Sequence, residues 1–453
     1  MTSQGAADDS SPMMRWIAPL LLALTSACHD EVSLQLEGEG RTNPPGAALG
    51  PFAWSELPGG EDQSQLLDMA WTADGGLLAA IVLYGPDPLS PDFQRTTLVR
   101  YDADGNRQWV VEEPDGLGPL SVTPDGGVVA AHQLIGWLGD LPMPPVGLDW
   151  FAADGQLTRS WRLLPSDGIG ELREVHAVQA TPDGGAVWSG ITVDDLDEVA
   201  VAGRMDGAGQ LLWAVPVQPS EPAAVEPRQI VATPDGGVVV LVSQSAGDPE
   251  GPVVDASYLV GLDPDGGEAW RVLLTGCIPR SLDLTPSGGL VVSGVFFGSL
   301  SAGDVLLEGE DDVQQPFLVE IAPDGEVLAG RTFDAPPAQG DPTAYTYAAR
   351  HGADGLSAAG IHLGRDDDGE PSSDGMWIAD YDVNGTLLSQ SLLRLSGGGV
   401  RSGPSHLSVG PAGRRVLGGS FRGLIDLGDG EVSSGEGSPS RAFIAVYDPQ
   451  GVD

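Results

Sequence analysis

The chain has 453 residues and a formal net charge of −44, and it contains no lysine, so all 21 of its basic residues are arginine. Such an acidic surface repels phosphate backbones and argues against nucleic-acid binding, and the missing lysine excludes a P-loop lysine or a Schiff-base lysine. With 65 glycines and 37 prolines, the composition favours many short strands joined by turns over long helices.

The first segment along the chain has the features of an export signal. Arg15 precedes an apolar run, Trp16 to Leu24, which is too short to cross a hydrocarbon core of about 30 Å as a helix. A charged start, a short apolar centre and small residues are typical of a secretory signal. Residues 25–27 and Cys28 resemble a bacterial lipobox, although residue 25 is threonine where that motif prefers leucine. The resemblance implies a lipid on the Cys28 thiol; the alternative is an ordinary signal peptide followed by a coincidental cysteine.

These features divide the chain into three parts. We predict a signal peptide over residues 1–27, a lipidated Cys28 with a flexible acidic tether over 28–50, and one folded domain over 51–453. The anchor would hold that domain at the cell envelope, on the outer membrane or its periplasmic face, or exposed at the surface. The second cysteine, Cys277, is then expected to be a buried, inert thiol.

From residue 51 onward the sequence repeats one unit seven times. A turn of the form Thr-x-x-Gly-Gly recurs at intervals of 51 to 67 residues when its two weaker copies are included. The copies start at Thr72, Thr123, Thr181, Thr233, Thr285, Gly352 and Gly410. In Thr-Pro-Asp-Gly-Gly, proline presets φ at the first corner and glycine accepts a positive φ, which predicts a tight hairpin.

A second turn, rich in Asp and Gly, alternates with the first and also occurs seven times. Its copies start at Tyr101, Phe151, Met205, Leu262, Ile321, Tyr381 and Tyr447. Continuous apolar runs such as 236–242 flank the turns and suit strands that are buried on both faces. The strand after the second turn carries a tryptophan in four units: Trp109, Trp161, Trp213 and Trp270. Each unit therefore contains four strands.

Seven four-stranded units predict an all-β fold, a single seven-bladed β-propeller. The seventh unit ends after its second turn and lacks a fourth strand, whereas an unassigned segment containing Trp54 precedes the first unit. We therefore predict that this N-terminal strand completes the last blade, because a ring closed in this way leaves no open edge. Both turn series then lie on one edge of the ring, and the longer connections lie on the other. Those connections are 84–95, 135–146, 243–255, 298–313, 364–375 and 423–440.

Units five and seven share a longer pattern. It reads Gly294-x-Phe296-x-Gly298-x4-Gly303-Asp304 in one and Gly419-x-Phe421-x-Gly423-x4-Gly428-Asp429 in the other. Together with the turns, this pattern resembles the seven-bladed beta-propeller repeat of exported bacterial proteins, often myxobacterial lipoproteins. The resemblance covers most of residues 51–453 and implies the propeller fold and export. It implies no activity, because that family has none in common.

The sequence offers no catalytic residue. Gly-x-Ser-x-Gly, His-Glu-x-x-His and Cys-x-x-Cys do not occur, and the six histidines show no ligand spacing. The turn at Leu262 resembles the docking turn of quinoprotein propellers, but it has Asp-Gly in place of Thr-Gly. The turns also resemble the Asp box of sialidases, from which Ala103 departs. A non-enzymatic role is favoured, and the alternative is an enzyme with a dispersed site, either quinoprotein-like or glycoside-acting.

Calcium is the one ligand for which the sequence offers candidates. Asp366, Asp367, Asp368 and Asp374 are weak calcium candidates, since Ca²⁺ takes six to eight oxygen ligands; the alternative is a solvated acidic loop. No other cofactor is predicted.

Variable loops on a rigid scaffold usually carry recognition, so the sequence predicts a binding or scaffolding module. We expect a monomer with a protein or glycan partner, no nucleic acid, and membrane contact through the anchor. A calcium-dependent adhesion protein is a further alternative.

Overall fold

In a computed structural model, the described residues lie between 52 and 448. The gaps are 59–62, 86–93, 114–115, 134–145, 163–170, 195–196, 218–223, 246–255, 286, 311–314, 334–342, 353–354, 366–370, 383–385, 397–402, 428–429 and 435–439. Residues Gly46–Asp453 form one compact unit. No helix of the described part is long and apolar enough to cross a membrane.

Antiparallel strands build seven four-stranded blades, as the repeats predicted. From the inner to the outer strand, blade 1 consists of β2 (Gln63–Trp71), β3 (Leu77–Tyr84), β4 (Gln94–Tyr101) and β5 (Arg107–Glu113), and blade 2 of β6 (Leu117–Val122), β7 (Val128–His132), β8 (Gly147–Phe151) and β9 (Leu157–Arg162). Blade 3 consists of β10 (Glu171–Ala180), β11 (Ala186–Asp194), β12 (Asp197–Met205) and β13 (Leu211–Pro216). Blade 4 consists of β14 (Ala224–Ala232), β15 (Val238–Ser245), β16 (Ala256–Leu262) and the first half of β17 (Glu268–Leu284). Blade 5 consists of the second half of β17, β18 (Leu290–Ala302), β20 (Gln315–Ile321) and β21 (Val327–Thr332). Blade 6 consists of β22 (Thr343–Gly352), β23 (Gly355–Arg365), β24 (Pro371–Asp382) and β25 (Leu387–Ser396). Blade 7 consists of β26 (Gly403–Val409), β27 (Arg415–Phe421), β30 (Arg441–Tyr447) and β1 (Phe52–Glu56).

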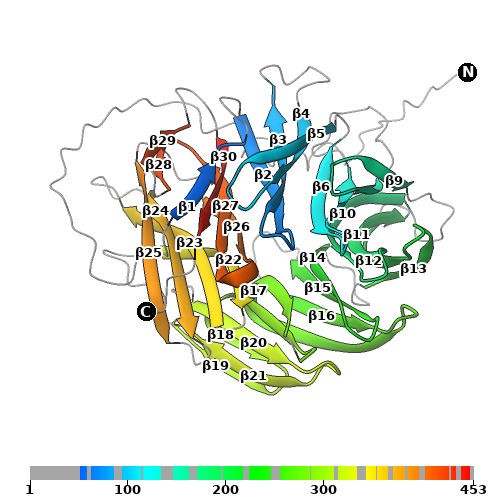
Figure 1. The fold of residues 1–453 in the computed structure, drawn as a ribbon. Coiled ribbons are helices and arrows are strands. Elements are labelled where there is room, and N and C mark those ends of the chain that lie inside the picture. The colour runs from blue at the N-terminus through cyan, green and yellow to red at the C-terminus, as the bar shows by residue number, and fades with distance from the viewer. Residues whose placement is uncertain are drawn as a thin grey trace, which may run out of the picture. The chain divides into compact units, whose positions relative to one another are not determined.

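The inner strands of successive blades touch one another around a closed ring. Contacts join β2 to β6, β6 to β10, β10 to β14, β14 to β17, β17 to β22 and β22 to β26, and β26 returns to β2. Figure 1 shows the sheets around a common centre, with the blue β1 beside the red β30. The protein is therefore a seven-bladed β-propeller.

The N-terminal strand β1 completes the seventh blade, as the sequence predicted. Trp54 pairs with Val446 and Phe52 with Tyr447 across the β1–β30 ladder. The Trp54 side chain is 9% exposed, and its ring centroid lies 5.6 Å from that of Tyr101 in blade 1. One strand thus closes the blade edge and also packs against the first blade.

The hydrophobic core of the described residues consists of clusters between neighbouring blades. In β15, Val239 and Leu241 belong to the cluster shared with blade 5, whereas Val238, Val240 and Val242 belong to the one shared with blade 3. Successive side chains of a strand point to opposite faces. A strand such as β15, which is packed between two neighbouring blades, therefore needs apolar residues at successive positions. This requirement explains the continuous apolar runs seen in the sequence.

Two of the long connections are ordered hairpins rather than open loops. After Gly298 the strand β18 continues to Ala302 and pairs with β19 (Val305–Glu308). The matching hairpin of blade 7 is β28 (Leu424–Asp426) with β29 (Glu431–Ser433). Each hairpin also pairs with the outer strand of the preceding blade, so the shared pattern of units five and seven builds a bridge between blades.

Candidate functional site

The predicted ligand and anchor residues lie mostly outside the described part of the chain. Cys28 and the aspartates 366–368 are not among the described residues. Asp374 lies in β24, next to Gly375, which pairs with Arg394 near the end of β25, but the Asp374 side chain is not among those described. The calcium and lipid sites therefore remain predictions. Cys277 is 1% exposed in β17 and forms no disulfide.

The aspartates of the first turn series have a structural role. Within each Thr-x-Asp-Gly-Gly turn, the threonine hydroxyl donates to the aspartate two residues later; the pairs are Thr72–Asp74, Thr123–Asp125, Thr181–Asp183 and Thr233–Asp235. This hydrogen bond is the main reason why the pKa of each aspartate lies below its ordinary value. These carboxylates therefore stay ionised and hold the hairpin closed.

The second turn series uses its first aspartate in a similar way. Asp102, Asp206 and Asp263 each accept two backbone N–H bonds from the turn that follows. An aspartate that accepts backbone N–H groups locally is a common turn stabiliser. The most conspicuous acidic residues of the repeats thus build turns.

Tryptophans of the outer strands link blades 1, 3 and 4 to the blades that follow them. The indole N–H groups of Trp109, Trp213 and Trp270 donate to turn carbonyls of the following blade at 2.8, 2.8 and 3.0 Å. The ring of Trp109 lies against Gly155, where an added Cβ would stand 2.9 Å from it. Trp161 lies in the outer strand β9, as the sequence predicted, but it does not belong to this series of hydrogen bonds. It pairs with Leu148, and Arg159 occupies the repeated position opposite Trp150.

Polar side chains of the inner strands also cross from blade to blade. Asp68 accepts the backbone N–H of Leu120 at 2.9 Å, and Ser121 accepts that of Ala180 at 3.0 Å. Gln179 and Gln229 continue the series to blades 4 and 5. This belt, together with the tryptophans, makes the ring a rigid scaffold.

His406 belongs to this structural belt. Its Nε2 lies 3.7 Å from Asp68 across the junction of blades 7 and 1. Burial lowers the pKa of His406, and the charge of Asp68 opposes this effect. The imidazole of His406 is therefore neutral, and its neighbour Asp68 already accepts the backbone N–H of Leu120. We therefore assign His406 a role in packing between blades 7 and 1.

A second histidine, His176, lies in a group of charged side chains outside the hydrogen-bonded belt. We call this group the His176 cluster; it consists of Glu174, His176, Glu226 and Arg228. His176 lies 3.6 Å from both carboxylates, one on its own strand β10 and one on β14. Arg228 pairs with Glu226 at 2.8 Å. The charged side chains are 40–47% exposed, and His176 lowers the pKa of Glu174.

The His176 cluster lies on the inner strands β10 and β14, which both begin at the edge of the ring that carries the long connections. We call this edge the loop edge and the opposite one, which carries both turn series, the turn edge. The spacing of the histidines in the sequence did not reveal the cluster, since its members come from two blades. The described residues contain no group of three or more His, Cys, Asp or Glu side chains suited to a metal ion.

A buried ion pair lies in blade 2 near the loop edge. Asp149 on β8 has a side chain that is 3% exposed, and its carboxylate lies 3.0 Å from His132 Nδ1 and 2.7 Å from Arg162. Burial alone would raise the pKa of Asp149, but hydrogen bonds from His132, Arg162 and Ser160 outweigh it and lower the pKa to about 2. The sequence prediction missed this group because its three members lie on three strands.

Comparisons with known proteins give only distant structural similarities. No protein-family model matches the sequence, and no curated protein is recognisably similar to it. Among solved structures, the chain is similar to the periplasmic gluconolactonase PpgL of Pseudomonas aeruginosa, with 16% identity, a TM-score of 0.45, and coverage of 84% of this chain and 99% of that one. It is also similar to Sqt1 of Chaetomium thermophilum, with 13% identity, a TM-score of 0.45, and coverage of 88% and 98%. The neighbours are β-propellers that include enzymes and binding proteins.

Proposed function

We propose that the chain is an exported, lipid-anchored propeller of the kind found in myxobacterial lipoproteins, and that it works as a binding or scaffolding module at the cell envelope. The His176 cluster supports this proposal, because it presents exposed charges of both signs from rigid inner strands toward the loop edge. Fixed polar groups beside variable loops suit recognition of a polar protein or glycan surface. The module is a monomer in this proposal, and it binds no nucleic acid.

The binding role is tested by crosslinking in native cells. We compare the wild type with the double variant Glu226→Gln/Arg228→Gln, which neutralises the pair in the His176 cluster. The matched control is Glu268→Gln/Arg271→Gln, which removes another ion pair, 2.7 Å long, from the outer half of β17. We expect a partner that is captured by the wild type and the control but lost from the first variant. Equal capture by all three would contradict a role for the cluster in binding.

A second candidate function follows from the position of His176. An imidazole between two carboxylates is suited to proton transfer, so the cluster also fits a glycoside-acting enzyme. Hydrolysis of a glycoside by the wild type that is lost in His176→Gln would identify an enzyme and replace the binding proposal.

The anchor leads to a separate prediction. Cys28→Ser removes the thiol that would carry the lipid, so we expect the variant to be recovered in the soluble or unprocessed fraction. The wild type should follow the membranes, because several acyl chains each contribute about 0.8 kcal/mol per buried CH₂. Equal partitioning of both proteins into detergent would contradict lipidation.

Calcium binding at Asp366, Asp367, Asp368 and Asp374 leads to another prediction. A cation that binds only the folded state stabilises it by about 2.7 kcal/mol at a hundred times Kd. We expect millimolar calcium to raise the thermal midpoint relative to chelator at matched ionic strength, and Asp367→Asn to reduce the shift. If magnesium or sodium chloride produces the same shift, the effect is charge screening and no calcium site exists.

A further inference from the structure

One blade junction differs from its neighbours in the order of two side chains. Where the third and fourth strands of a blade pair, blade 1 has Arg100 opposite Trp109 and blade 3 has Arg204 opposite Trp213. Blade 2 has the reverse order, with Trp150 on the third strand β8 and Arg159 on the outer strand β9. The junction of blades 2 and 3 is therefore built from the same residue types in exchanged positions.

The junction of blades 1 and 2 shows what an arginine on the third strand does. The Arg100 guanidinium pairs with Asp74 of its own blade at 2.7 Å. It also donates to the carbonyls of Gly126 and Ala153, on the two turns of the next blade, at 3.2 and 2.9 Å. One guanidinium thus fills the space between a turn carboxylate and the turns of the following blade.

At the junction of blades 2 and 3, no single guanidinium that the structure describes contacts both the turn carboxylate and the turn carbonyls of the following blade. Arg159 donates to the equivalent carbonyls, those of Gly184 and Gly207, from the outer strand. Its guanidinium lies over the ring of Trp150, 4.0 Å from the centroid. Asp125, the counterpart of Asp74, receives the hydroxyl of Thr123, but no arginine of the described chain pairs with it.

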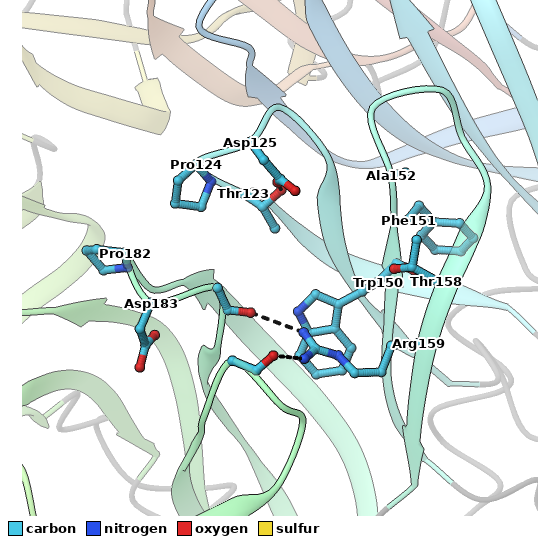
Figure 2. A pocket seen from close by; sticks show the side chains of 12 residues that line it. Thr123, Pro124, Asp125, Trp150, Phe151, Ala152, Thr158, Arg159, Pro182 and Asp183 are labelled. Atoms are coloured by element: carbon cyan, nitrogen blue, oxygen red, sulfur yellow. Dashed lines mark hydrogen bonds between the residues drawn. The ribbon is translucent and has the colours of Figure 1, made fainter.

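A hollow of about 570 Å³ occupies this junction on the turn edge. Asp125, Trp150, Arg159 and Asp183 all line it. Figure 2 shows Asp125 on one turn, Asp183 on the neighbouring turn, and the stacked Trp150 and Arg159 facing both across the hollow. The Thr123 hydroxyl is the first cause that lowers the pKa of Asp125, so its carboxylate is ionised at neutral pH.

We propose that this hollow binds a guanidinium cation from outside the fold, supplied by a small guanidino compound or by an arginine side chain of a partner. The ligand would occupy the place beside Asp125 that corresponds to that of Arg100 beside Asp74. A planar guanidinium presents a fork of N–H donors to a carboxylate, whereas an ammonium group acts as a compact point charge. The inference is independent of the proposed function, since the hollow lies on the turn edge.

The charges of the hollow favour a cation despite the presence of Arg159. The Arg159 donors are directed at the Gly184 and Gly207 carbonyls. Burial lowers the pKa of Arg159, and the charge of Asp206 opposes this effect. Asp125 and Asp183 add two further carboxylates to the lining. The formal net charge of −44 also raises the local concentration of cations around the molecule.

The test is calorimetric titration of the full-length protein with N-acetyl-arginine amide. We expect saturable one-to-one binding, at least tenfold weaker binding of the lysine analogue, and none of the neutral citrulline analogue. Asp125→Asn should weaken arginine binding at least tenfold, because asparagine still accepts the Thr123 hydroxyl but carries no charge. The matched control Asp235→Asn changes the same turn in blade 4 and should bind as the wild type does. Binding of the citrulline analogue, or equal loss in both variants, would overturn the proposal.

A residue exchange provides a second test that does not depend on Asp125. The double variant Trp150→Arg/Arg159→Trp recreates the order of blade 1 and supplies an internal guanidinium to Asp125. We expect it to fold with an unchanged or higher thermal midpoint and to lose binding of the arginine amide. Persistent binding would place the ligand elsewhere and overturn the proposal.

The same titration distinguishes the source of the cation. Tighter binding of the peptide Gly-Gly-Arg-Gly-Gly than of the amide would indicate a partner protein, and equal binding would indicate a small guanidino compound. If neither binds, the proposal is wrong.

Discussion

Deletion of strand β1, residues 52–56, is expected to turn the protein into an aggregating species. The β1–β30 ladder pairs Trp54 with Val446 and Glu56 with Ile444, so its loss leaves β30 as an open edge. An unpaired edge strand is a template for pairing with other chains. Size-exclusion chromatography should show oligomers or loss of soluble protein, and a monomer with an unchanged urea midpoint would contradict closure by this strand.

A single substitution tests the packing part of the same argument. Trp54→Ala should lower the free energy of unfolding by about 3–5 kcal/mol, as large-to-small changes of buried aromatic residues do. The indole is packed against Gly105 of the next blade, where an added Cβ would stand 2.6 Å from the ring. Leu212→Ala on β13 is the control, since Leu212 is 53% exposed and should change stability by less than about 0.5 kcal/mol.

The second large effect is expected at the buried carboxylate of blade 2. Asp149→Asn leaves Arg162 and His132 without their shared anion, and removal of one partner from a buried ion pair costs about 3–5 kcal/mol. Urea unfolding at pH 7 measures the loss. Glu112→Gln, an exposed change on β5, is the control and should stay within about 0.5 kcal/mol. Equal stability of Asp149→Asn and the wild type would show that the pair contributes nothing.

The same residue predicts a pH dependence with a definite sign. The folded pKa of Asp149 is about 2, below the ordinary value of 3.8. The unfolded chain therefore takes up this proton first as the pH falls, and the stabilisation that is present above about pH 4 is lost toward pH 2. Asp149→Asn should lack this component, so the difference between variant and wild type should shrink between pH 4 and pH 2. A constant difference over that range would contradict the assignment.

Local chemistry explains why the fold was predictable. Each Thr-x-Asp-Gly-Gly hairpin is stabilised by contacts within five residues, such as the hydrogen bond from the Thr72 hydroxyl to Asp74, so the turn can be recognised from its local sequence alone. Burial between two blades imposes the apolar runs around Val238–Val242. Blade number and the closing role of Trp54 follow from counting these units.

The charged groups of the candidate sites were not predictable in this way. Glu174 and Glu226 stand in separate repeats, and they meet at His176 only because β10 and β14 are adjacent in the ring. The hollow could not be predicted from the repeats, because the residues that line it belong to two blades. The register shift between Trp150 and Phe151 also occurs between Arg100 and Tyr101 and between Arg204 and Met205, so Arg159, and not Trp161, holds the position of Trp109 and Trp213 in blade 2.

By itself the sequence determined the repeating unit, the number of blades and the strand that closes the ring, because turn chemistry and alternating burial act over a few residues. Only the tertiary structure decided how the charges are used. Arg100 and Arg159 bind carbonyls of the following blade. Arg100 also pairs with Asp74, whereas Asp125 has no arginine partner among the described residues. These outcomes depend on distances between blades, which no local pattern of residues specifies.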